Sequence, residues 1–113
     1  MYALINSLIA SIKPTTAKYS VDAFSRLVDL EKIADDYNSY DSINTRYSDI
    51  DEIDEITDSF ISDVENDFYA DNGIYDDENA NKVINVIYDI FTAFSEWTDE
   101  ISDNSHSVSF WNV

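Results

Sequence analysis

The side chains of this chain that could do chemistry are mostly carboxylates. The 113 residues include 24 Asp and Glu, one His, no Cys and one Gly. Paired carboxylates can act as general acid and base, but no surrounding motif singles out one pair among the many in this sequence. His106 has no second His or Glu at metal-ligand spacing, and Gly73 alone cannot form a phosphate-binding loop. We therefore expect no enzyme, no catalytic residue and no cofactor.

A calcium site is the metal centre that carboxylates at short intervals would favour. Asp63, Glu65 and Asp67 fit positions 1, 3 and 5 of an EF-hand loop. Position 6 is Phe68 where the loop needs Gly, and position 12 is Ile74 where it needs Glu. We expect no metal site.

The charge balance excludes several partners. Six Lys and Arg against 24 acids give a formal charge of -18, so the chain cannot neutralise a run of phosphates or an anionic membrane surface. No apolar stretch is long enough to span a bilayer, and the apolar residues 2–12 lack the basic flank and cleavage site of a signal peptide. We expect no direct nucleic-acid binding, no membrane binding and a cytoplasmic location in a bacterial host cell.

Apolar residues at three-to-four spacing predict an all-α fold. With 44% hydrophobic residues, 8 Tyr and 6 Phe, the chain is too apolar for an acidic disordered tail, and we expect one acidic helical domain over residues 1–113. Pro14 is expected to end the first helix, and Ser20 to cap the second. The expected architecture is a compact bundle of about four helices with a short C-terminal tail, residues 104–113, that is extended or packed on the bundle. The expected helices cover residues 2–12, 20–37, 48–69 and 77–102.

The acids are concentrated in the middle of the chain. The segment from Asp35 to Glu78 holds 16 acids and one base, Arg46. The expected third helix carries nine acids and no base, although like charges three or four residues apart cost roughly 0.2 to 0.5 kcal/mol per pair. Nine charges along about 33 Å of helix give one per roughly 3.7 Å, against about 3.4 Å per phosphate on one strand of B-DNA. This helix could present a row of anions to a protein that normally grips a nucleic acid.

Tyrosines interleave with these acids. In a small Cys-free helical domain, this combination resembles the DNA-mimic proteins of bacteriophages and mobile elements, which include anti-restriction and anti-CRISPR proteins. The resemblance lies in composition and charge layout, mainly over residues 35–78, and no motif carries a functional residue over individually. It implies an inhibitor that occupies the DNA-binding channel of a host defence enzyme. The interleaved segments are Tyr40–Asp41, Tyr47–Asp49, Tyr69–Asp71 and Tyr75–Asp77.

We therefore expect a partner with a basic nucleic-acid-binding cleft, such as a CRISPR effector or a restriction enzyme. Three alternatives stay open: an immunity or antitoxin protein that neutralises a basic nuclease toxin, an acidic chaperone, and salt adaptation. Phe110 and Trp111 could cover one end of the bundle or form a homodimer contact. The expected partner-binding residues are Asp35, Asp36, Asp41, Asp49, Asp51, Glu52, Asp54, Glu55, Asp58, Asp63, Glu65, Asp67, Asp71, Asp76 and Asp77.

Overall fold

The chain folds into a bundle of helices. The computed structural model describes the backbone of residues 1–39, 49–70 and 77–111, and the side chains of residues 1–38, 50–68 and 78–100. Helices are the only regular secondary structure within these ranges, so the expected all-α bundle of about four helices is confirmed. The helices are α1 (Tyr2–Tyr19), α2 (Val21–Ser39), α3 (Asp49–Ala70) and α4 (Asp77–Trp111).

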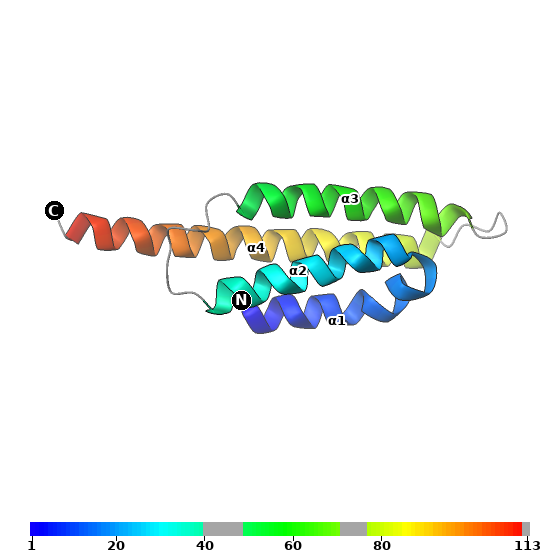
Figure 1. Cartoon of the computed structure of the whole chain (residues 1–113), viewed down its shortest axis with the longest axis horizontal. Helices are drawn as coiled ribbons and strands as arrows, with labels where there is room; N and C mark the ends of the chain where they lie inside the picture. Colours follow the sequence, from blue (N-terminus) through cyan, green and yellow to red (C-terminus); the bar gives the residue numbers. More distant parts are fainter. Residues whose placement is uncertain (40–48, 71–76, 112–113) are drawn as a thin grey trace.

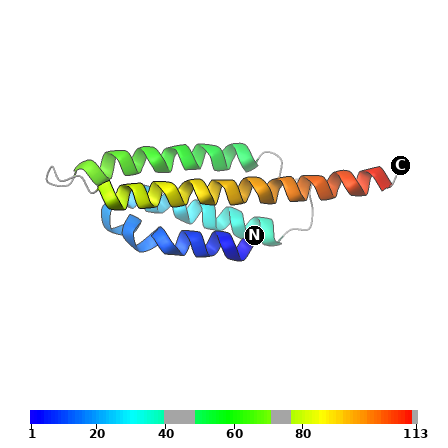
Figure 2. The same cartoon turned by 180° about the vertical axis from the view of Figure 1, so that it is seen from behind.

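Consecutive helices run in opposite directions along one long axis (Figure 1). α1 packs against α2 and α4, and α3 packs against the same two helices from the other side. α1 and α3 approach each other only marginally, so they occupy diagonal corners of the bundle, as the view from behind also shows (Figure 2). The two faces that α1 and α3 present to solvent therefore point in different directions.

One continuous core lies between the helices. It is built from the buried stripe of each helix, and its largest members are Phe60, Phe68 and Phe94. Three buried threonines satisfy their hydroxyl groups inside this core, which is what burial of a polar group requires. Thr16 donates to the carbonyl oxygen of Ile12 over 2.7 Å and Thr57 to that of Ile53 over 2.8 Å. The hydroxyl groups of Thr98 and Tyr37 share a hydrogen bond of 2.8 Å.

The prediction that Pro14 ends the first helix is wrong. α1 continues through Pro14 to Tyr19, because Thr16 extends the buried stripe of Ile5, Ile9 and Ile12 by another turn. Pro14 itself faces solvent, and so does Ala10, whose carbonyl group loses its helical partner because proline has no N–H. The packing of the far end of α1 outweighs the single hydrogen bond that proline removes.

Ser20 alone connects α1 to α2. Its backbone N–H donates to the carbonyl oxygen of Thr16 over 2.8 Å, while its hydroxyl oxygen accepts from the N–H of Ala23 over 3.0 Å. The expected role of Ser20 as N-cap of the second helix is confirmed, and the same residue also caps the end of α1.

α4 is longer than the sequence pattern predicts. Its helical backbone runs to Trp111, beyond the expected end at about residue 102, so residues 104–111 of the tail, which was expected to be extended or packed on the bundle, continue the helix. Figures 1 and 2 show this last part projecting beyond the ends of the other three helices. At the point where the projection starts, Trp97 packs against Tyr37 and Tyr2, with ring centroids 5.0 Å and 6.4 Å away.

Candidate functional site

The outward face of α3 is covered with carboxylates. Its inward face includes Ile53, Phe60, Val64 and Phe68, all buried in the core. The acidic face of α3, as we call it here, comprises the acids of this helix whose side chains are exposed to solvent: Asp51, Glu52, Asp54, Glu55, Asp58 and Glu65.

Four members of the acidic face follow one line along the helix. Asp51, Asp54, Asp58 and Glu65 are separated by three, four and seven residues, so they lie on one side of α3 at intervals of one or two turns. Glu55 and, further round the helix, Glu52 lie to one side of this line. The distance from residue 51 to residue 65 is about 21 Å along the axis, so the six charges follow one another at an average axial interval of about 4.2 Å.

These six carboxylates have no counter-ion in the part of the chain that the structure describes. Its two ion pairs join Lys13 to Glu31 over 2.8 Å and Arg26 to Asp63 over 3.3 Å. Neither pair involves the acidic face, and none of the six side chains forms a hydrogen bond there. Their mutual repulsion is therefore relieved only by solvent and salt.

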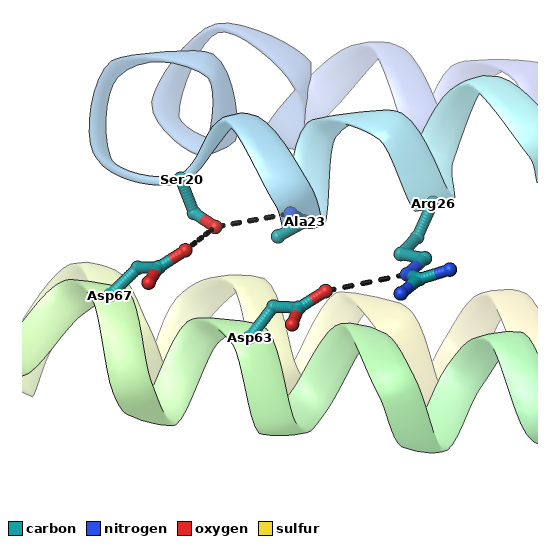
Figure 3. A network of polar contacts seen from close by, with 5 residues as sticks. All are labelled: Ser20, Ala23, Arg26, Asp63 and Asp67. Carbon is teal, nitrogen blue, oxygen red and sulfur yellow. Dashed lines mark hydrogen bonds and ion pairs between the residues drawn. The ribbon is translucent and has the colours of Figure 1, made fainter.

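Two other acids of α3 turn towards α2 and do not join the acidic face (Figure 3). Oδ2 of Asp63 accepts a hydrogen bond from Nε of Arg26, and Asp67 accepts one from the hydroxyl group of Ser20. Both side chains are partly buried. The only sequence signal for these contacts with α2 was that the two acids lie one turn apart and that the preceding helix carries a base, Arg26.

Asp35, expected to extend the acidic row from the second helix, faces α1. Its Oδ1 accepts a hydrogen bond of 2.5 Å from the phenol of Tyr2. This bond stabilises the neutral phenol and raises the pKa of Tyr2 above its ordinary value. The side chain of Asp36 is exposed on the same helix.

The remaining expected partner-binding residues are only partly described. Asp49 begins α3 and Asp77 begins α4, but their side chains lie outside the described part. Asp41, Asp71 and Asp76 lie outside the described residues altogether.

The described surface also exposes large apolar side chains. Tyr88 on α4 is 53% exposed, whereas Phe94 further along the helix is buried and Trp97 is partly buried. Ile84 and Phe91 are partly buried on the flank of α4 opposite Trp97, which packs towards Tyr2 of α1. The register of the helix places Tyr88 on this same flank, the one beside α3.

Other kinds of site are not evident among the described residues. No group of three or more possible metal ligands comes together in these ranges. None of the helices described here has the length and apolar character needed to cross a membrane. Comparisons of the chain with protein families, curated proteins and solved structures find no match.

Proposed function

We propose that this protein is an inhibitor that mimics a nucleic acid. In this proposal the acidic face of α3 occupies the basic channel in which a host defence protein, such as a CRISPR effector or a restriction enzyme, binds DNA or RNA. The observation that carries the proposal is a set of six exposed carboxylates on one helix, four of them in line, for which the described residues provide no counter-ion.

The cost of this row supports a role in binding. Like charges three or four residues apart, such as Asp51 with Glu55 and Asp54 with Asp58, destabilise a helix by roughly 0.2 to 0.5 kcal/mol per pair. A surface needed only for solubility could alternate signs and avoid this cost. α3 itself carries no base, and Lys13 and Lys18 lie on α1.

The spacing of the row supports a nucleic acid as the mimicked ligand. An average axial interval of about 4.2 Å between these charges is of the same order as the roughly 3.4 Å per phosphate of one DNA strand. The packed bundle holds α3 straight against its neighbours, so little ordering of the backbone is needed on binding. The long-range field of a chain with charge -18 would also speed its encounter with a basic cleft.

The experiment that tests the proposal begins with capture of binding proteins from a bacterial lysate by the full chain. A captured nucleic-acid-binding protein is then titrated with the chain in the presence and absence of its DNA or RNA. We expect the two ligands to compete, and the affinity for the chain to fall steeply as salt rises. Binding that is insensitive to salt and leaves nucleic-acid affinity unchanged would contradict the proposal.

Charge reversal locates the contact. The triple change Asp54→Lys, Asp58→Lys and Glu65→Lys should abolish inhibition while the circular dichroism spectrum stays helical, because these side chains are exposed. The matched control reverses three exposed acids of α4, Asp89, Glu96 and Glu100, and changes the net charge equally. Equal loss in the two variants would show that net charge, and not the acidic face of α3, determines binding.

A further inference from the structure

The apolar stripe that α4 contributes to the core continues beyond the bundle. Inside the bundle its members are fully buried, and the intervals between them alternate between three and four residues. Alternating intervals of this kind are the repeat of a coiled coil. The buried members are Ala80, Val83, Ile87, Ile90 and Phe94, and the same intervals continue through Trp97, Ile101, Asn104, Val108 and Trp111.

The other helices end before this stripe does. α1 begins at Tyr2, α2 ends at Ser39 and α3 begins at Asp49, all at the end of the bundle from which α4 projects (Figures 1 and 2). The helical backbone of α4 then runs on to Trp111, about 15 Å beyond residue 101. We call residues 101–111 the projecting segment. No described helix runs beside it, although its stripe positions continue the intervals of the residues that α4 buries in the core.

From this placement we infer that two copies of the chain pair through their projecting segments, in antiparallel orientation. The outer part of the stripe begins where α1, α2 and α3 end. A partner that covers this part must therefore lie beyond the ends of these three helices. A parallel second copy would direct the rest of its α4 into these helices. An antiparallel copy arrives from the opposite side, and its own bundle stays clear of the first.

The distribution of charge favours a second copy at this segment. Two chains with a charge of -18 repel each other, and the repulsion is smallest where they meet at sites of low charge and keep their acidic parts apart. Residues 101–113 contain a single acid, Asp103. The antiparallel arrangement also places the two acidic bundles at opposite ends of the dimer.

The positions of the stripe are self-complementary in this orientation. Pairing about residue 106 sets position 101 opposite 111 and position 104 opposite 108, so each stripe position meets another. Two-fold pairs of this kind are the commonest form of homodimer. Asn104 is a polar residue in an otherwise apolar stripe, which weakens such a pair and restricts its register. A pair of three-turn helices is a small interface, so we expect reversible association.

Sedimentation of the full chain tests the dimer. We expect the mass to rise from 13.0 kDa towards twice that value between about 1 µM and about 1 mM protein. Small-angle scattering should then show a particle about 110 Å long, because two chains of 63 Å overlap by about 15 Å. A monomer over the whole range, or a dimer no longer than one chain, overturns the inference.

Two neighbouring substitutions provide a matched pair. Val108→Asp puts a charge on the stripe and should weaken association at least about tenfold, whereas Ser109→Asp adds the same charge on the other side of the helix and should change it less than about twofold. Asn104→Leu should tighten the dimer. Equal effects of the two aspartates would overturn the inference. The measurement needs no target protein, so its outcome is independent of the proposed function.

Discussion

Arg26 on α2 donates from Nε to Oδ2 of Asp63 on α3 across 3.3 Å. This is the ion pair by which the described part of the bundle ties α2 to its most acidic helix, and both side chains keep partial contact with solvent. Partly exposed pairs contribute about 0.2 to 1 kcal/mol.

We expect Arg26→Ala to lower the free energy of unfolding by an amount in that range. A double-mutant cycle with Asp63→Ala, followed by urea denaturation, isolates the pair. The coupling energy should shrink as salt rises, because salt screens partly exposed charges. A coupling that is absent at low salt would show that the two side chains do not interact.

The hydrogen bond from Tyr2 to Asp35 predicts a loss of stability at high pH. Because the pKa of the phenol is raised in the folded state, its contribution is complete below the ordinary value of 10.0 and is lost as pH rises through the folded value. The free energy of unfolding of the unchanged chain should therefore fall relative to that of Tyr2→Phe above pH 10. Parallel pH profiles for the two proteins would argue against the bond.

Pro14→Ala should stabilise the protein. Alanine restores an N–H donor to the carbonyl of Ala10 within a helix that already passes through position 14. We expect a gain of about 1 to 3 kcal/mol, reduced by the greater freedom of alanine in the unfolded chain. The matched control is Ser11→Ala, whose hydroxyl group bonds to the carbonyl of Leu8 and whose loss should bring no such gain. A less stable Pro14→Ala variant would mean that the proline contributes more than it costs.

Salt should raise the thermal midpoint of the chain. Five pairs within the acidic face of α3 lie three or four residues apart, and their repulsion adds up to roughly 1 to 2.5 kcal/mol. Relief of about 1 kcal/mol of it corresponds to a shift of about 4 °C for a domain of this size. The variant with Lys at positions 54, 58 and 65 should shift less, because its repulsion is already relieved. Differential scanning calorimetry at low and high sodium chloride measures both.

Tyr88→Ala tests how far the proposed contact extends. If the target lies across α3, the half-exposed ring on the neighbouring flank of α4 should lie within the interface. Its removal should then cost about 1 to 2 kcal/mol of binding, as truncation of an interfacial tyrosine often does. Leu4→Ala is the control, because Leu4 is exposed on the diagonally placed α1. Unchanged binding in Tyr88→Ala would confine the contact to α3.

Periodicity predicted the bundle because each helix has one apolar stripe, but it placed some residues on the wrong side. Val21 fits the apolar spacing of the expected helix over residues 20–37 but is 77% exposed, whereas Ala23 is buried. The small residues Ala23, Ala80 and Ala93 are also buried, and hydrophobicity alone does not distinguish them from surface alanines.

The sequence predicted that α3 carries an acidic face, but it did not predict which acids belong to this face. Sequence showed that α3 has no base, but it could not show which flank meets α2. The flank that meets α2 depends on the packing order of the helices. In the structure this flank carries Asp63 and Asp67, which contact Arg26 and Ser20. The pairing of Asp35 with Tyr2 spans 33 residues and had no local signal.

The diagonal placement of α1 and α3 gives the molecule a transverse electric dipole. α1 carries Lys13 and Lys18 and no acid, whereas α3 carries nine acids and no base. In the field of a positively charged partner, such a dipole experiences a torque that turns α3 towards the partner before any contact forms. Collisions would then occur mainly in the orientation that presents the carboxylates, so a larger share of encounters would be productive.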